Sequence, residues 1–235
     1  MSDMFYNLIR SVGRPVFWLS SSPTVLHADR LKATAGAMIL APNHLSPYDV
    51  PCLMASTPRK LDFVSVAEFF RNPLSGWFLR SMNAFPLDRG RRDAAATRKI
   101  LERLERGRTV AMFPEGQIRT AESSALTGGA FKGSVTRLAR LADVPIMPCV
   151  VLATGAFARP SAWLPLRRTR YGVNFGEPLR VSRAGDEEIA CAEATILLKR
   201  AYDEGYAELC AASGLTVADS PWRRPRTVTE TVSGE

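Results

Sequence analysis

The sequence has few residues suited to acid–base or metal chemistry near neutral pH. Its 235 residues include only two histidines, His27 and His44, and four cysteines that are scattered without C-x-x-C spacing. This composition argues against a zinc site and against a disulfide framework, so reduced thiols are the simplest expectation. We therefore expect neither a metal centre nor another resident cofactor.

Long hydrophobic runs are also missing. No apolar run reaches the roughly 18 to 20 residues that a membrane-spanning helix needs. The longest apolar stretch, residues 144–158, contains two prolines and a glycine and is typical of a core strand with its exit loop. Arg10 and Arg14, together with the lack of a small-residue cleavage pattern, argue against a signal peptide.

Acidic residues are outnumbered by basic ones, 23 to 31, which gives a net charge of +8. This balance implies an anionic partner: nucleic acid, a membrane surface or a phosphorylated substrate. Because no zinc-finger, helix-turn-helix or aromatic-rich RNA-binding motif is present, we expect no nucleic acid and favour a membrane or a phosphate. The basic clusters Arg91-Arg92 and Arg167–Arg170 can either lie on a solvated surface or face lipid, and a solvated surface is the favoured interpretation.

The N-terminal residues have helical periodicity. One apolar stripe comprises Phe5, Leu8, Ile9, Val12, Val16 and Leu19. Either this stripe lies in a membrane interface as an amphipathic helix, or it packs on the core as an ordinary first helix. Pro15 is expected to kink or split the helix.

After a predicted chain breaker at Ser20–Pro23, short apolar runs alternate with helical segments. This alternation predicts a single α/β domain with a mostly parallel or mixed central sheet flanked by helices. The expected strands are 37–41, 61–66, 84–87, 109–113, 146–152 and 170–175, and the expected helices are near 49–55, 73–82, 92–106, 131–141 and 186–210. We expect residues 1–22 to form the N-terminal helix, 23–212 the domain, and 213–235 a basic disordered tail.

His44 and Asp49 form the first candidate site. His44 follows the buried run of residues 37–41, and a histidine beside a carboxylate has the parts of a general base and its orienting partner. The alternative is structural: Ser46 would cap a helix that starts at Pro47, and Asp49 would bond back to the cap amide.

A second motif, Phe113-Pro114-Glu115-Gly116, ends the predicted strand 109–113. In parallel α/β sheets ligands bind outside the carboxyl ends of strands, so this motif and His44 can face one crevice. A buried Glu115 would need hydrogen-bond partners or a ligand, and Gly116 permits a tight turn or a close backbone approach.

These two motifs resemble those of the glycerolipid acyltransferases of the lysophosphatidic acid acyltransferase type. Two further blocks follow the order of that family: Ala84-Phe85-Pro86-Leu87-Asp88-Arg89 and Val144-Pro145-Ile146-Met147-Pro148. The resemblance implies that His44 and Asp49 are catalytic and that Arg89, Glu115, Gly116 and Arg119 bind the substrate. Gln117-Ile118-Arg119 stands where Thr-Arg-Ser is common, so the arginine is displaced by one position.

The resemblance also implies a reaction. An acyl group would pass from a coenzyme A or acyl-carrier-protein thioester to the hydroxyl of 1-acylglycerol-3-phosphate, at the cytoplasmic face of the membrane. The absence of a G-x-S-x-G motif favours direct attack over an acyl-enzyme. Alternatives are another lysophospholipid or an ornithine or glycolipid acceptor, and, from a different class, a non-catalytic protein that binds lipid surfaces.

Overall fold

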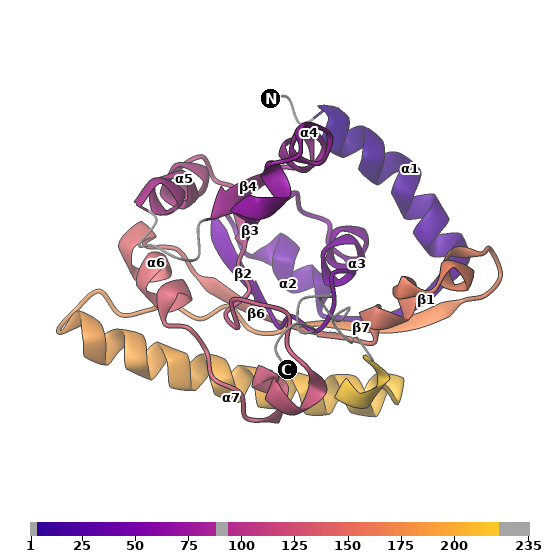
Figure 1. The fold of residues 1–235 in the computed structure, drawn as a ribbon. Helices are drawn as coiled ribbons and strands as arrows, with labels where there is room; N and C mark the ends of the chain where they lie inside the picture. Colours follow the sequence, from indigo (N-terminus) through magenta and orange to yellow (C-terminus); the bar gives the residue numbers. More distant parts are fainter. Residues whose placement is uncertain (1–3, 88–93, 221–235) are drawn as a thin grey trace, which may run out of the picture.

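The structure, a computed structural model, describes residues 4–87 and 94–220, and its centre is one seven-stranded sheet (Figure 1). The strands lie in the order β1-β7-β6-β2-β5-β3-β4, and every neighbouring pair is parallel except β6 and β7. They span β1 Ser21–Leu26, β2 Met38–Pro42, β3 Leu61–Val66, β4 Ala84–Leu87, β5 Thr109–Ala111, β6 Ile146–Leu152 and β7 Thr169–Phe175. The predicted α/β class is confirmed, with a mixed sheet.

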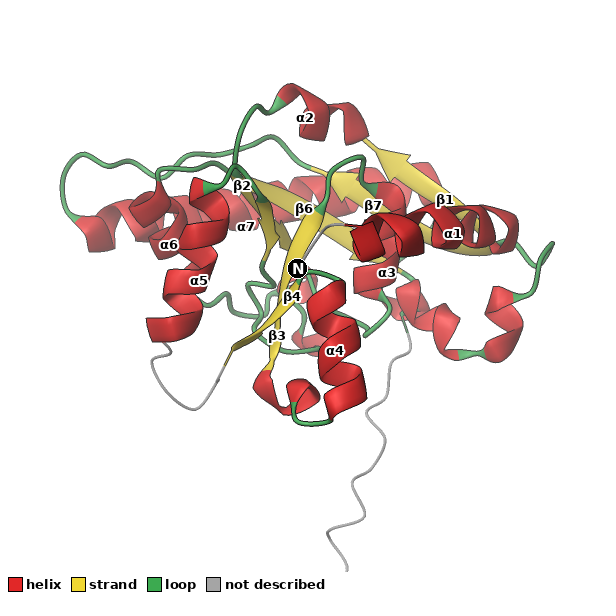
Figure 2. Ribbon diagram, turned by 90° about the horizontal axis from the view of Figure 1, so that it is seen from above, coloured by secondary structure: helices red, strands yellow, loops and turns green. Residues whose placement is uncertain are grey.

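Helices cover both faces of this sheet (Figures 1 and 2). The α-helices are α1 Met4–Ser20, α2 Ala28–Ala33, α3 Asp49–Ser56, α4 Pro73–Ser81, α5 Ala94–Glu105, α6 Ser134–Ala142 and α7 Glu187–Ser213. The short 3-10 helices are η1 Ala67–Phe70, η2 Ala121–Ser123, η3 Ala125–Thr127, η4 Thr154–Ala158, η5 Pro160–Trp163 and η6 Val217–Asp219. Helices α5, α6 and α7 pack on one face, and α1, α2 and α3 pack on the other.

The central strand β2 shows why both faces are covered. Ile39 and Ala41 belong to the core cluster under α5, α6 and α7, while Met38 and Leu40 belong to the cluster under α1, α2 and α3. All four side chains are fully buried. Successive side chains of a strand point to opposite faces, so a strand covered on both sides is a continuous apolar run.

Three neighbouring strands place the candidate site. Because β2 pairs in parallel with both β5 and β6, the carboxyl ends of these strands meet at one edge of the sheet. The segments that leave this edge begin at Asn43, Met112 and Ala153. The edge is where ligands bind in open α/β sheets, as the sequence predicts for the His44 and Glu115 motifs.

The predicted chain breaker at Ser20–Pro23 is correct for the helix, because α1 ends at Ser20. The residues from Ser21 onward enter β1, which lies at the edge of the sheet and pairs with β7 among the described strands. An edge strand tolerates Pro23 because a residue there can leave its nitrogen unpaired on the free side. The predicted boundary between residues 22 and 23 therefore falls inside a strand.

Two further expectations concern the chain ends. Of the two effects expected of Pro15, a kink or a split, the split does not occur, because α1 is one continuous helix. At the other end, the residues after α7 are ordered against the domain as far as Ser220: Leu215 is buried, and the hydroxyl of Ser220 accepts a hydrogen bond from the amide of Ala153 at 2.7 Å. Residues 221–235 of the predicted tail lie outside the described part of the chain.

Candidate active site

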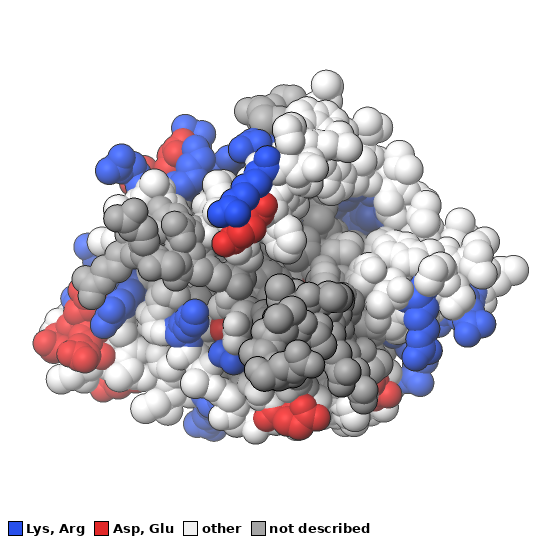
Figure 3. All heavy atoms as spheres, viewed as in Figure 1, with Lys and Arg blue, Asp and Glu red and all other residues white. Residues whose placement is uncertain are grey.

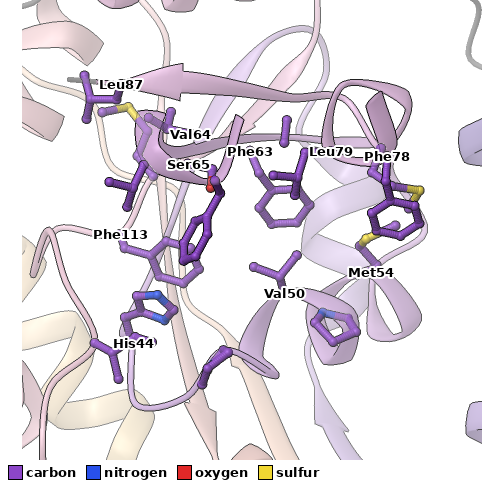
Figure 4. Close-up of a pocket in the computed structure, with 18 of the residues that line it drawn as sticks. His44, Val50, Met54, Phe63, Val64, Ser65, Phe78, Leu79, Leu87 and Phe113 are labelled. Atoms are coloured by element: carbon purple, nitrogen blue, oxygen red, sulfur yellow. The ribbon is translucent and has the colours of Figure 1, made fainter. Parts of the chain in front are cut away.

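His44 and Asp49 lie together after β2. The Nδ1 atom of His44 is 2.9 Å from Oδ2 of Asp49, and the His44 ring stacks on Phe113 with centroids 3.9 Å apart. Because Nδ1–H donates to the carboxylate, the lone pair of the neutral ring is on Nε2. Figure 4 shows the ring directed into a pocket. This is the geometry of a general base with an orienting carboxylate.

Asp49 also fulfils part of the structural role that the sequence offers as an alternative. Its Oδ2 accepts hydrogen bonds from the amides of Leu45 at 2.9 Å and Ser46 at 3.0 Å. The expected bond to the Ser46 amide is therefore present. The helix, however, begins at Asp49, two residues after the predicted start at Pro47. One buried carboxylate therefore fixes both the turn and the imidazole.

Thr154 completes the environment of Asp49. It follows β6, is fully buried, and its hydroxyl donates to Oδ1 of Asp49, the oxygen that does not face His44. Both carboxylate oxygens thus have partners, as a buried carboxylate requires. Sequence reasoning missed Thr154, because only the parallel pairing of β2 with β6 brings residue 154 to residue 49.

Glu115 is a buried support beneath His44 rather than part of the pocket lining. Its Oε2 accepts from the His44 amide at 2.8 Å, and its Oε1 accepts from the Ser124 hydroxyl at 2.9 Å and the Ala125 amide at 2.6 Å. Burial raises the pKa of this carboxyl above its ordinary value, and the three hydrogen bonds oppose that rise. With both oxygens bonded to the protein, the geometry favours positioning over the substrate contact that the sequence predicts.

Arg119 also contacts His44 through its main chain. Its amide donates to the His44 carbonyl at 2.8 Å, so the backbone of His44 is held on both sides. The guanidinium makes a long hydrogen bond of 3.4 Å to the Glu115 carbonyl, and its buried Nε has no hydrogen-bond partner among the described residues. The side chain does not line the pocket. Arg89, the other predicted phosphate ligand, lies outside the described residues.

The pocket beside His44 is a cavity of about 960 Å³ with a mainly apolar wall. Such a volume is at the upper end of the range for small-molecule sites. Its lining includes Phe113, Val50 and Met54 of α3, Phe63 of β3, and Leu79 of α4 (Figure 4). A long apolar group would fill this space, with its reactive end at the imidazole.

Lys132 supplies a positive charge at the reactive end. It lines the same cavity, and its amide donates to the Pro114 carbonyl at 2.8 Å. Its side chain passes over Gly116, where a Cβ would come within 2.8 Å of Nζ. Gly116 has φ of +69°, a left-handed conformation that favours glycine. The sequence offers no signal for Lys132, which lies 88 positions after His44.

Most of this chain is similar in sequence to known acyltransferases. The family model described as Acyltransferase matches residues 23–152. A 1-acyl-sn-glycerol-3-phosphate acyltransferase of Streptococcus pneumoniae is 30% identical over 182 residues, covering 76% of this chain and 64% of that protein. The alignment thus spans slightly less than two thirds of the pneumococcal protein.

Other relatives give a similar result. A protein of the same description from Bacillus subtilis is 27% identical, covering 74% of this chain and 82% of its own length. A lyso-ornithine lipid O-acyltransferase of Pseudomonas aeruginosa is 33% identical over 115 residues, covering 48% of this chain and 42% of that protein. The crystal structure of the acyltransferase PlsC from Thermotoga maritima has a TM-score of 0.63 at 23% identity, covering 85% of this chain and 78% of that one, which supports the fold.

Proposed function

This chain belongs to the acyltransferase family, and we propose that it transfers a fatty acyl group from a thioester donor to the hydroxyl of 1-acylglycerol-3-phosphate. The product is phosphatidic acid. The observation that carries the proposal is the imidazole of His44, oriented by Asp49 and directed into a large apolar cavity. The donor is an acyl-coenzyme A or an acyl carrier protein thioester.

The reaction proceeds by direct attack. His44 Nε2 takes the proton of the acceptor hydroxyl, the oxygen adds to the thioester carbonyl, and the tetrahedral intermediate collapses with loss of the thiolate. The imidazolium then returns its proton to the thiolate, so the net products are an ester and a free thiol. Asp49 stabilises the imidazolium while it exists.

Neighbouring side chains that could act as nucleophiles are poorly suited to that role. Burial raises the pKa of the thiols of Cys52 and Cys149 well above the ordinary value, so both stay protonated. Ser46 is fully buried, and its hydroxyl accepts a hydrogen bond from the Tyr48 amide at 3.1 Å. These features support direct transfer without an acyl-enzyme.

Thr154 acts as a positioning residue through Asp49. Replacing it by valine, which has nearly the same shape, removes the donor to Oδ1 and is expected to lower kcat by roughly tenfold with little change in the KM of either substrate. Thr154→Ser keeps the hydroxyl and is expected to restore most of the rate. Steady-state kinetics of the two variants test this role. A Thr154→Val enzyme with the wild-type kcat would contradict it.

Lys132 binds the acceptor phosphate, with Arg89 as a second cation that the family motif supplies. Lys132→Gln is expected to raise the KM for a phosphate-bearing acceptor by about 10- to 100-fold, because a hydrogen bond to a charged group contributes about 1.5–3 kcal/mol. The KM for a phosphate-free monoacylglycerol should hardly change. Lys99→Gln, on the surface helix α5, is the matched control. An equal effect on both acceptors would indicate that Lys132 does not recognise phosphate.

Attachment to a membrane surface is part of the proposal, and we place the protein at the cytoplasmic face as a peripheral protein. Helix α1 packs on the domain through Tyr6 and Phe17. By contrast, Leu8 and Val12 of its apolar stripe are exposed, and so is Trp18 near the end of the helix. This exposure favours the membrane-interface interpretation of the stripe over packing on the core. Among the described helices, none is long and apolar enough to cross a bilayer.

A second acceptor is a lyso-ornithine lipid. The match to the Pseudomonas protein supports it. The same His44 mechanism serves both acceptors.

The direct test is an assay of purified protein with a panel of lysolipid acceptors and both donor types, read by mass spectrometry. Formation of phosphatidic acid from 1-acylglycerol-3-phosphate, lost in a His44→Ala control, is the expected result. Transfer to lyso-ornithine lipid alone would identify that lipid, rather than 1-acylglycerol-3-phosphate, as the acceptor. No transfer from either donor would contradict the enzyme proposal and favour a lipid-binding protein.

A further inference from the structure

Acidic residues are distributed unevenly along the chain. Three stretches, residues 4–28, 69–87 and 144–176, contain no aspartate or glutamate. The same stretches contain eight arginines: Arg10, Arg14, Arg71, Arg80, Arg159, Arg167, Arg168 and Arg170. By contrast, α7 alone has six acidic residues. The three stretches are far apart in the sequence, so whether they contribute to one surface depends on where they lie in the fold.

Helix α1, in the first stretch, contacts the other two stretches at its two ends. At the start of α1, the Phe5 ring contacts Trp77 of α4 at a centroid distance of 5.1 Å. At its end, the Phe17 ring contacts Trp163 at 5.1 Å, and the Leu166 amide donates to the Leu19 carbonyl at 3.2 Å. Figure 3 shows no red atoms over α1, while blue atoms border this part of the surface.

Residues 159–168 form a loop with an unusual surface, which we call the 159–168 loop. Leu164 and Leu166 are 57% and 87% exposed, and they stand on either side of Pro165. Leu166 has φ of +74° and Arg168 has φ of +51°. A left-handed backbone costs roughly 1–2 kcal/mol for a residue with a side chain, so this strained shape presents an apolar side chain to solvent at a cost.

Three arginines surround the exposed leucines. Arg159, Arg167 and Arg168 are all exposed, and none of them forms an ion pair with another described residue. The base of the loop is fixed, because the Trp163 indole donates to the Phe157 carbonyl at 2.9 Å and packs on Phe17. The loop thus has a fixed base at Trp163, two exposed leucines at its tip, and arginines around them.

We propose that the 159–168 loop is a second membrane-insertion element, in which Leu164 and Leu166 enter an anionic leaflet and Arg159, Arg167 and Arg168 bind lipid headgroups. The inference rests on the membrane attachment in the proposed function, and it extends the contact surface beyond α1. The sequence alone favours a solvated surface for Arg167–Arg170. The structure changes that interpretation because it sets the cluster beside the exposed end of α1, where Trp18 is 76% exposed.

Charge selects a lipid surface over a second copy of this chain. A symmetric contact through this surface would bring two arginine-rimmed, acid-free faces together, and like charges across an interface are repulsive. An anionic leaflet attracts the same arginines, while leucines flanked by basic residues are typical of interfacial anchors.

The test is flotation of the full-length protein with phosphatidylcholine vesicles that either contain or lack phosphatidylglycerol. Arg167→Gln/Arg168→Gln is expected to weaken binding to the anionic vesicles by about 25-fold, since each basic residue near such a surface contributes about a fivefold change in affinity. Leu164→Ser/Leu166→Ser is expected to weaken binding to both kinds of vesicle by about tenfold or more. Ile196→Ser/Leu197→Ser, which changes exposed apolar residues of α7 away from this surface, is the matched control and should bind as wild type.

Two results would overturn the proposal. One is wild-type vesicle binding by both loop variants. The other is a dimer in analytical ultracentrifugation that the leucine variant dissociates, which would assign the loop to self-association. Because flotation requires no turnover, failure of the catalytic proposal is measured separately, by acyl transfer to a short-chain, water-soluble acceptor, a reaction that both loop variants should catalyse at the wild-type rate.

Discussion

Replacing His44 by alanine is expected to lower kcat for acyl transfer by about 10²- to 10⁴-fold, the usual contribution of a positioned general base. The fold should survive, because the Asp49 carboxylate keeps its bonds to the amides of Leu45 and Ser46 and to Thr154. The KM for the acceptor should change little, since the imidazole acts mainly on the proton that moves in the transition state.

The other histidine provides the matched control for this experiment. His27 lies at the start of α2 and pairs with Glu208 at 2.7 Å, with no place in the cavity lining. His27→Ala should therefore transfer acyl groups at the wild-type rate, whereas His44→Ala should not. A His44→Ala enzyme with wild-type kcat and an unchanged melting temperature would require a different base.

Replacing Glu115 by alanine is expected to lower the free energy of unfolding by about 2–6 kcal/mol. The variant leaves the amides of His44 and Ala125 without an acceptor, and each buried unsatisfied donor costs about 1–3 kcal/mol. Since the stability of a domain is typically about 5–15 kcal/mol, this is a large fraction of it. The rate of acyl transfer should also fall, because Glu115 fixes the backbone of His44.

A glutamine at position 115 sharpens the test. Its single oxygen can accept from either His44 or Ala125, and its amide group then faces the other N–H, so one donor always loses its partner. Glu115→Gln should therefore cost about 1–3 kcal/mol, less than alanine. Urea denaturation measures both variants, with the exposed Glu105→Gln as a control that should stay within about 0.5 kcal/mol of wild type. An unchanged Glu115→Ala midpoint would contradict the supporting role.

Glu115 also makes stability depend on pH in a defined direction. Burial raises the pKa of this carboxyl in the folded state above the ordinary value of 4.5, so between those two pKa values the folded protein binds more protons than the unfolded chain. The contribution of Glu115 to stability therefore falls as pH rises from about 4.5 through the folded pKa, and it is constant above that. Glu115→Gln should remove this component from a plot of unfolding free energy against pH.

The sequence predicts three strands with the bounds that the structure has: 61–66, 84–87 and 146–152. The last of these is an uninterrupted apolar run that is buried on both faces, and such a run bounded by turn residues admits few other structures. The edge strand β1 was missed because its first four residues are serine, proline and threonine rather than an apolar run. Half exposed and containing Pro23, it becomes a strand only because β7 pairs with it.

The candidate site divides in the same way. By itself, the sequence determined the pairing of His44 with Asp49, because a five-residue separation across a helix start brings the two side chains together. Only the tertiary structure decided that Glu115 supports His44, that Thr154 bonds to Asp49 and that Lys132 reaches the cavity. Those contacts span 71 to 105 positions and depend on which strands are neighbours, and strand order is set by packing of the whole sheet rather than by any local pattern.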